Sequence, residues 1–175
     1  MKKVFLGLGS NLEDRAANLN DAKIRIEESI GSVISASSIY ETAPWGFESD
    51  DAFLNMVLCV ETDLSPSGLL GRILMIESQL GRIRFEQKYS SRSIDIDILL
   101  YDNEIVNEAA LKIPHPGMHE RRFVLVPLCE IASGFIHPVL KKSVGSLLKS
   151  CSDKSRVVMY IWSGPQDSKT AGPFL

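Results

Sequence analysis

Two aspartates separated by one residue, Asp95 and Asp97, have the type and spacing that could do chemistry in this 175-residue chain. They lie in Arg92-Ser-Ile-Asp-Ile-Asp-Ile-Leu-Leu-Tyr101, where apolar residues alternate with the acids. Such alternation, with β-branched residues, is typical of a strand. Because residues i and i+2 of a strand face the same side, both carboxylates should point one way, while the isoleucines and Leu100 face the core. Two acids at this spacing suit a pair of Mg²⁺ ions about 3.5–4 Å apart, as in two-metal phosphoryl-transfer sites.

A basic segment directly precedes this strand and contains Arg82, Arg84, Lys88 and Arg92. The exposed polar face of an ordinary amphipathic strand is the simpler interpretation of a bare D-x-D pattern. However, Asp is disfavoured in strands, and like charges on one face repel each other unless a cation lies between them. Acids that bind a metal, next to bases that bind phosphate, predict a site for a nucleotide polyphosphate.

The composition indicates one compact domain, which we expect to span residues 1–162, followed by a disordered tail at 163–175 that lacks periodicity. The formal net charge of −3 and the pI of about 5.6 argue against a nucleic-acid or anionic-membrane partner. Three scattered cysteines indicate reduced thiols, and no stretch is long enough to cross a membrane. We therefore expect a soluble, cytoplasmic monomer.

Hydrophobic periodicity predicts the order βαββαβ, which is the ferredoxin-like arrangement of an α+β protein with helices packed on an antiparallel sheet. A C-terminal extension should follow this core. The predicted core elements are a strand at 4–8 that ends in a turn at 9–11, a helix at 14–30, strands at 33–40 and 53–61, a helix from the Ser65-Pro66 cap to Gly81, and the acidic strand. In the extension we expect a short strand at 104–106, an apolar segment at 123–131, a helix at 144–149 and a strand at 157–162.

Four segments of the chain resemble the 6-hydroxymethyl-7,8-dihydropterin pyrophosphokinases, enzymes of folate biosynthesis. They are Gly7–Asn11, Tyr40–Pro44 with Phe53–Asn55, Gly81–Arg84 through Arg92–Ile98, and Pro114–Pro116 with Arg121–Leu128. The resemblance covers residues 4 to about 138 and implies a ferredoxin-like core. It also implies transfer of pyrophosphate from ATP to the hydroxymethyl group of a reduced pterin, with release of AMP.

The resemblance also implies roles for individual residues around the phosphates. Asp95 and Asp97 would bind two Mg²⁺ ions, and Arg82 and Arg92 would be the catalytic arginines that hold the transferred group. His115 would donate a hydrogen bond to phosphate. The implied ATP-binding set is Glu77, Arg84, Lys88, Ile98, Lys112, His115 and Arg121. From the residues alone, Arg84 and Lys88 could instead be solvated surface charges, and Glu77 could be a solvent-facing helix residue.

The implied pterin pocket has side chains whose chemistry suits a flat heterocycle. Trp45 and Phe123 can supply aromatic faces, although both could also be core residues. Asn55 is a lone amide in an apolar strand, and it offers a donor and an acceptor to the edge of the ring. The full implied set is Thr42, Ala43, Pro44, Trp45, Asn55 and Phe123.

Five residues at three places in the chain depart from the family pattern, and we expect them to affect rate or affinity. Tyr89-Ser90-Ser91 stands where many members have Trp-Gly-Pro, which changes the freedom of a loop expected to close over ATP. Ala43 replaces a frequent proline. Ala110 replaces an occasional arginine, for which Lys112 could compensate.

Other functions remain possible from the residues alone. The principal alternative is a non-catalytic ferredoxin-like module that binds a small molecule, since an RNA-recognition domain would need exposed aromatics and a basic balance. A kinase that forms a nucleoside diphosphate with another acceptor would share the phosphate site but not the pterin pocket. Binding of the pterin would therefore distinguish a pyrophosphokinase from such a kinase.

Overall fold

The structure, a computed structural model, describes residues 1–44, 51–81 and 93–164. Within these residues a six-stranded antiparallel sheet and a two-stranded sheet combine with four α-helices and one 3₁₀ helix. The elements are β1 (Lys2–Ser10), α1 (Arg15–Ser29), β2 (Ser32–Ala36), β3 (Ile39–Thr42), β4 (Phe53–Thr62), α2 (Pro66–Gln79), β5 (Asp95–Tyr101), β6 (Val106–Asn107), β7 (Lys112–Ile113), η1 (Met118–Glu120), α3 (Arg122–Ala132), α4 (Val144–Ser150) and β8 (Val157–Tyr160).

The strand order of the large sheet is β5-β1-β4-β3-β8, with β2 also paired to β4. Because β2 and β3 both pair with β4, they share the place of the second strand in a ferredoxin-like sheet. Every pair in the sheet is antiparallel. The predicted α+β class with a ferredoxin-like βαββαβ core is therefore confirmed.

Local sequence signals set the ends of the two core helices, and of these the Ser65-Pro66 start and the Gly81 end of α2 were predicted. Asp14 precedes α1, and its side chain accepts a hydrogen bond from the backbone N–H of Ala17. Ser65 caps α2 in the same way, with Pro66 at the first helical position. Gly81 follows α2 with a φ of 80°, a left-handed conformation that glycine adopts without a Cβ penalty.

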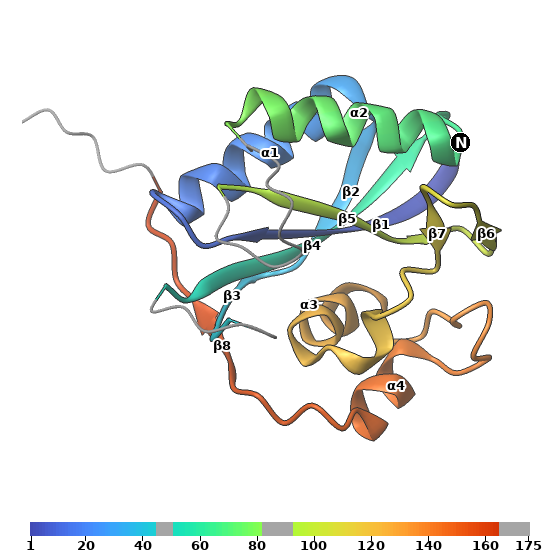
Figure 1. Ribbon diagram of the computed structural model, residues 1–175. Helices are drawn as coiled ribbons and strands as arrows, with labels where there is room; N and C mark the ends of the chain where they lie inside the picture. The colour runs from blue at the N-terminus through green and yellow to red at the C-terminus, as the bar shows by residue number, and fades with distance from the viewer. Residues whose placement is uncertain (45–50, 82–92, 165–175) are drawn as a thin grey trace, which may run out of the picture.

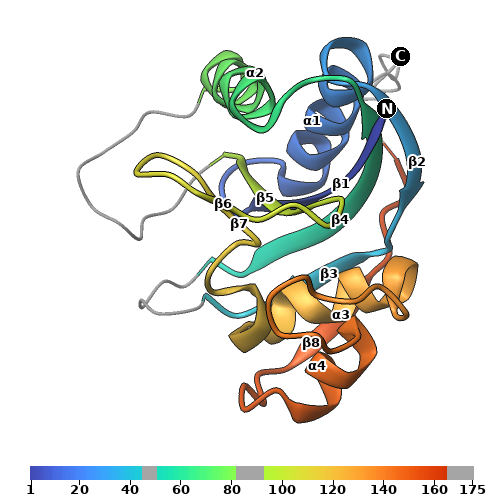
Figure 2. The same cartoon turned by 90° about the vertical axis from the view of Figure 1, so that its right-hand side faces the viewer.

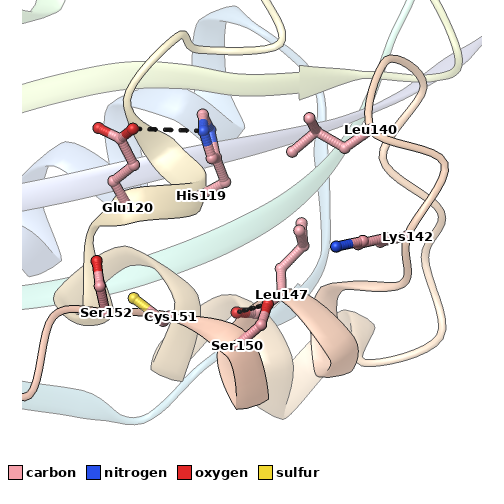
Figure 3. A pocket seen from close by; sticks show the side chains of 8 residues that line it. All are labelled: His119, Glu120, Leu140, Lys142, Leu147, Ser150, Cys151 and Ser152. Atoms are coloured by element: carbon pink, nitrogen blue, oxygen red, sulfur yellow. Dashed lines mark hydrogen bonds and ion pairs between the residues drawn. The ribbon is translucent and has the colours of Figure 1, made fainter.

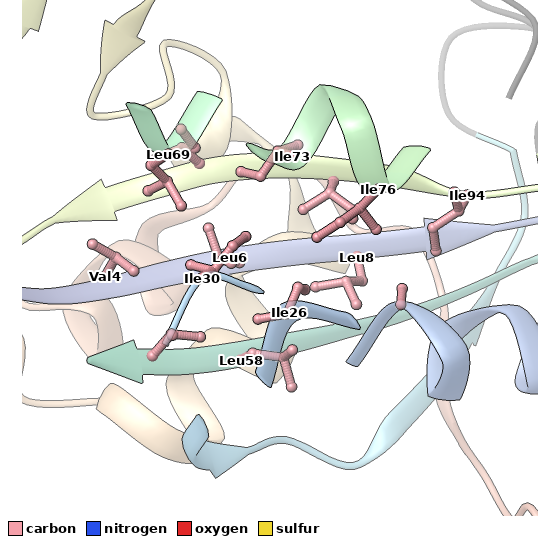
Figure 4. Packing of buried hydrophobic residues seen from close by; sticks show 14 of the residues in the cluster. Val4, Leu6, Leu8, Ile26, Ile30, Leu58, Leu69, Ile73, Ile76 and Ile94 are labelled. Atoms are coloured by element: carbon pink, nitrogen blue, oxygen red, sulfur yellow. The ribbon is translucent and has the colours of Figure 1, made fainter. Parts of the chain in front are cut away.

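The two faces of the sheet are covered by different helices. Helices α1 and α2 lie on one face, and α3 and α4 lie on the other (Figure 1; Figure 2 shows the same layers after a quarter turn). Between the sheet and α1/α2 lies an apolar core that includes Leu6, Leu8, Ile26, Leu58 and Ile73 (Figure 4). A second apolar cluster packs α3 and α4 against the opposite face.

The predicted strand at 33–40 is wrong as a single element, because it divides into β2 and β3. Ser37 lies at the division, where its backbone N–H donates to the Val57 carbonyl and its Oγ accepts from the Val57 N–H at 2.9 Å. A serine side chain thus replaces one backbone partner of β4, and the ladder is interrupted there.

A bulge in β5 overturns the expected orientation of Leu100. Leu6 of β1 pairs with Ile98, whereas its neighbour Phe5 pairs with Leu100, so β5 has one extra residue at Leu99. Leu99 and Leu100 therefore both belong to the cluster against α3, and Leu100 does not share a face with Ile96 and Ile98. The predicted turn at 9–11 is also wrong in part, because β1 continues through Ser10.

The C-terminal extension follows the predictions more closely. The helix at 144–149 is α4, and the strand expected at 157–162 is the shorter β8; the strand expected at 104–106 overlaps β6 only at Val106. The apolar segment at 123–131 forms α3. None of the described helices is long and apolar enough to span a membrane. The expectation of a disordered tail concerns mainly residues 165–175, which lie outside the described residues.

Candidate active site

The pairing of three strands sets the two aspartates on one face of the sheet. Asp97 lies opposite Gly7, and Asp95 lies opposite Gly9, which is itself opposite Asn55 on β4. Directly opposed residues of antiparallel strands point to the same face. The carboxylates therefore point away from the α1/α2 core, which contains Ile96 and Ile98. Both acids are half-buried, and the prediction that they share a face is confirmed.

Glycines form the floor between the acids and the amide of Asn55. A Cβ on Gly9 would lie 3.3 Å from Asn55 Oδ1, and a Cβ on Gly7 would lie 3.3 Å from the Leu99 side chain. Two strand spacings separate Asp95 from Asn55, a distance of about 10 Å between their backbones. The backbone of Gly9 thus separates an acidic end, at Asp95 and Asp97, from an amide end, at Asn55, on one face of the sheet.

The amide end is fixed by a buried hydrogen bond. Asn55 Nδ2 donates to Thr42 Oγ1 at 2.9 Å, and the two residues are only 6% and 5% exposed. The contact joins β3 to β4 and holds Asn55 Oδ1 above Gly9. The structure thus brings together two of the predicted pterin residues, and Ala43 and Pro44 follow Thr42 directly in the chain.

His115 lies near the acidic end, held by backbone contacts. Its N–H donates to the carbonyl of Leu99 in the β5 bulge, and its Nδ1 accepts from the Gly117 N–H at 3.2 Å. Burial, then the positive charge of Arg121, lowers the pKa of His115 to about 4, although Asp95 acts in the opposite direction. The ring is therefore neutral at pH 7, and because Nδ1 accepts, the proton is on Nε2.

Arg121 lies near His115, whose pKa its positive charge lowers. It is the residue before α3, and its guanidinium lies against Gly117, where a Cβ would come within 3.1 Å of Nε. Phe123, two residues further on, packs against the α3 cluster. Both predicted substrate contacts are thus carried by the first turn of α3 and the residue before it.

The residues that hold α3 in place were not predicted from the sequence. The N–H of Arg122 donates to Asp153 Oδ2 at 2.9 Å, which caps the helix from a segment 31 residues away. Burial alone would raise the pKa of Asp153, but hydrogen bonds from the backbones of Ser155 and Arg122 outweigh it, and the pKa is lowered. No local motif identifies such a cap, because the acid lies far from the helix in sequence.

Glu130 holds the other end of α3 against β3. Its Oε2 accepts from the backbone N–H of Ser38 at 2.9 Å and from the Tyr40 hydroxyl at 3.0 Å, and its Oε1 accepts from Ser38 Oγ at 2.9 Å. The helix that carries the Arg121 side of the site is therefore tied at both ends.

Two predicted ATP-binding residues lie on the α1/α2 face. Glu77 is 2% exposed, so the alternative of a solvent-facing position is wrong. Its Oε1 accepts from the N–H of Ile96, the residue between the two aspartates, at 2.9 Å. The Ile98 side chain is buried in the same core, so a contact with the nucleotide would have to use its backbone. Lys112 is exposed on β7.

Several predicted site residues lie outside the described residues. They are Trp45, Arg82, Arg84, Lys88 and Arg92, together with the Tyr89-Ser90-Ser91 segment.

A pocket of about 250 Å³ lies elsewhere, between η1, the end of α4 and the loop that precedes α4 (Figure 3). His119 and Glu120, whose Nε2 and Oε1 are 3.7 Å apart, line it together with Lys142 and Cys151. None of its lining residues was predicted as a site residue, and we assign no function to it.

Comparisons with solved structures identify the fold. By fold, the chain is similar to the crystal structure of the Plasmodium falciparum HPPK-DHPS wild type, with a TM-score of 0.69 and 17% identity. The match covers 85% of this chain and 44% of that one, so this chain spans less than half of the solved protein. At this identity the likeness establishes the fold.

The family follows from the sequence comparisons. The profile of the 7,8-dihydro-6-hydroxymethylpterin-pyrophosphokinase (HPPK) family matches residues 5–133. The 2-amino-4-hydroxy-6-hydroxymethyldihydropteridine pyrophosphokinase of Aquifex aeolicus is 42% identical over 81% of this chain and 88% of its own length. The enzyme of that name from Methylorubrum extorquens is 44% identical over 78% and 86%. The chain belongs to the 7,8-dihydro-6-hydroxymethylpterin-pyrophosphokinase family.

Membership of this family establishes the reaction class. The chain is an ATP-dependent transferase that transfers pyrophosphate from ATP to hydroxymethyldihydropterin in folate synthesis. The expected resemblance and activity are confirmed, and the alternative of a non-catalytic binding module is not.

Proposed function

We propose that the part of the α3/α4 face around Gly9 is the active site for this transfer, with the phosphates at Asp95 and Asp97 and the pterin at Asn55. The observation that carries the proposal is the register that aligns Asp95, Gly9 and Asn55 in one row. The acidic and amide ends lie about 10 Å apart. This distance suits a nucleoside triphosphate whose phosphates bind at the aspartates, next to a small heterocycle at Asn55.

The two carboxylates have the chemistry that Mg²⁺ requires. The ion prefers oxygen ligands, and it is usually bound by one or two carboxylates together with substrate phosphates and water. The described residues contain no group of three or more His, Cys, Asp or Glu side chains that could bind a metal. Two aspartates completed by ATP oxygens fit this pattern, and we propose that Asp95 and Asp97 bind two Mg²⁺ ions. Bound there, Mg²⁺ neutralises the charge that develops on the transferred phosphates.

Glu77, on the α1/α2 face, positions the strand that carries the two aspartates. Because its carboxylate accepts the N–H of Ile96, it holds the backbone of an edge strand between the two carboxylates. This contact fixes the direction in which both side chains point.

His115 and Arg121 contact the phosphates from the α3 side. His115 is neutral and donates through Nε2, while Arg121 supplies a guanidinium that can bind phosphate oxygens in a bidentate manner. The remaining ATP contacts are Lys112, Arg84 and Lys88, and the backbone of Ile98. Arg82 and Arg92 hold the transferred group in line for attack.

The hydroxymethyl pterin binds at the amide end. Asn55 recognises the amide edge of the ring, and Thr42 holds Asn55 in the required orientation. Phe123 and Trp45 supply the two aromatic faces, and Ala43 and Pro44 complete the wall. Excluding water there favours attack by the pterin hydroxyl over hydrolysis.

We also propose that the protein works as a monomer in the cytoplasm. Its three thiols, Cys59, Cys129 and Cys151, are not joined in disulfides, which agrees with a reducing compartment.

The test is product analysis by chromatography after incubation with ATP, Mg²⁺ and 6-hydroxymethyl-7,8-dihydropterin. We expect AMP and the pterin diphosphate in equal amounts, and neither product when the pterin is omitted or EDTA is added. Formation of ADP in place of AMP would reject pyrophosphoryl transfer.

A further inference from the structure

Arg15 is a half-buried cation on the α1 face of the sheet, and it joins parts of the chain that are far apart in sequence. It is the first residue of α1, and its side chain is 24% exposed. Its Nη1 donates to the carbonyl of Ala52 at 2.8 Å, and its Nη2 lies 3.0 Å from Glu41 Oε2. The guanidinium carbon lies 5.9 Å from the centroid of the Tyr160 ring on β8, within the range of a cation–π contact.

These partners stand at the two ends of the connection from β3 to β4. Glu41 is next to the last residue of β3, and Ala52 comes directly before β4. One planar guanidinium therefore fixes both ends, because its donors have a set geometry that cannot follow independent movements of two partners.

The same two strand ends carry the amide end of the active site on the opposite face. Thr42 follows Glu41, and Asn55 lies three residues after Ala52. The Asn55–Thr42 hydrogen bond bridges β3 and β4, so its geometry depends on how closely these strand ends are held. Arg15 lies beneath them and contacts neither side chain in the interactions described above.

We propose that Arg15 is a positioning residue for the pterin, which acts by clamping the ends of the β3–β4 connection so that Thr42 and Asn55 keep their relative position. This role rests on the proposed function of Asn55 and Thr42. It predicts a higher KM for the pterin and little change in the KM for ATP. The reason is that the acidic end of the site is on β5, an edge strand that β1 separates from β4.

The experiment compares Arg15→Ala, Arg15→Lys and Arg25→Ala with the wild type in the AMP assay, with the KM of each substrate measured separately. Arg25 is a matched control, since it lies on the same helix and donates a hydrogen bond to Gln79 Oε1 at 3.0 Å, away from β3 and β4. For Arg15→Ala we expect the KM for the pterin to rise about tenfold, as for loss of hydrogen bonds from a charged group, with the KM for ATP little changed. Arg15→Lys should lie between, because lysine can pair with Glu41 but lacks the fork.

Amide hydrogen exchange provides a readout that does not depend on catalysis. In Arg15→Ala we expect faster exchange at residues 39–44 and 52–55 than in the wild type, and no such change in Arg25→Ala. A uniform rise of both KM values, or unchanged exchange together with an unchanged pterin KM, would overturn the proposal. If the wild type formed no pterin-dependent AMP, the proposed function would fail, while the exchange data would still test the clamp.

Discussion

The two faces of the sheet are built from the same strands, yet they are completed in different ways. On the α1/α2 face, alternate residues of β1 and β5 are Leu6, Leu8, Ile96 and Ile98, all buried in one apolar core. On the other face, the residues between them are Gly7, Gly9, Asp95 and Asp97, which are only half-buried, although the α3/α4 cluster covers the rest of that face. We call the α1/α2 face the closed face, and the part around these four residues the open face. Alternate residues of one strand can thus serve different purposes: those that point to one face stabilise the fold, and those that point to the other face do chemistry.

This division has a physical consequence for mutations. Apolar side chains on the closed face stabilise the fold by leaving water, whereas half-buried acids and glycines on the open face remove far less apolar surface from water. Changes on the open face should therefore alter activity far more than stability, and changes on the closed face should do the reverse.

The largest effect on activity is expected from Asp95→Asn. The amide keeps the size of the side chain but loses the charge that binds Mg²⁺, so kcat/KM should fall about 10³-fold. The free energy of unfolding should change little by comparison, because the amide keeps the volume of the side chain and an oxygen that accepts hydrogen bonds. Steady-state kinetics and urea unfolding of the same preparation check both parts, and a large loss of stability would break the comparison.

The opposite result is expected for Ile73→Ala on the closed face. Ile73 is 1% exposed in the α1/α2 core, and replacing it leaves a cavity that should cost about 2–5 kcal/mol of unfolding free energy. Below its melting temperature the variant should keep both KM values close to those of the wild type. Urea unfolding together with kinetics at low temperature tests this, and a selective rise in one KM would contradict it.

His115 sharpens the comparison because it is a titrating group of the open face. Its pKa is about 4 in the folded protein and 6.5 in the unfolded chain, so between these values only the unfolded chain binds the proton. The free energy of unfolding should therefore fall as the pH drops from about 6.5 to about 4, by up to about 3 kcal/mol. Urea unfolding of the wild type and His115→Gln across this range checks it. The variant should lack this part of the slope, and identical slopes would disprove the assignment.

The smallest effect is expected at Asp153, which supports the open face indirectly. Asp153→Ala removes the cap of α3 and should cost about 1 kcal/mol, whereas Asp153→Asn should retain most of it because the amide oxygen can still accept from Arg122. Urea unfolding measures the difference between the two variants. Equal losses in both would show that charge, and not capping, is what matters there.

The closed face was the more predictable part of the molecule. The helical periodicity of α1 and α2, the cap of α2 at Ser65, and the alternation of β5 as far as Ile98 are local signals that were interpreted correctly. The shared orientation of Asp95 and Asp97 followed from the same alternation.

Tertiary contacts explain what the sequence analysis missed. A short apolar run cannot be assigned to strand or helix by periodicity, and Pro127 inside α3 is a residue that disfavours helix interiors, so the segment at 123–131 stayed unassigned. The division at Ser37 and the bulge at Leu99 depend on partner strands. The contacts that Asp153 makes with Arg122, Glu130 with Ser38, and Arg15 with Glu41 and Ala52 join residues at least 26 positions apart, where sequence spacing carries no signal.

The measurement that tests the account most directly is a Mg²⁺ titration of AMP formation in Asp97→Asn and Asp102→Asn. Asp102 is the matched control, since it directly follows β5, pairs with Lys2 at 3.6 Å and has a φ of 48°, which asparagine tolerates. We predict that Asp102→Asn titrates like the wild type and that Asp97→Asn shows almost no turnover at any Mg²⁺ concentration, with its stability intact. Wild-type turnover and Mg²⁺ dependence in Asp97→Asn would contradict the assignment of chemistry to the open face.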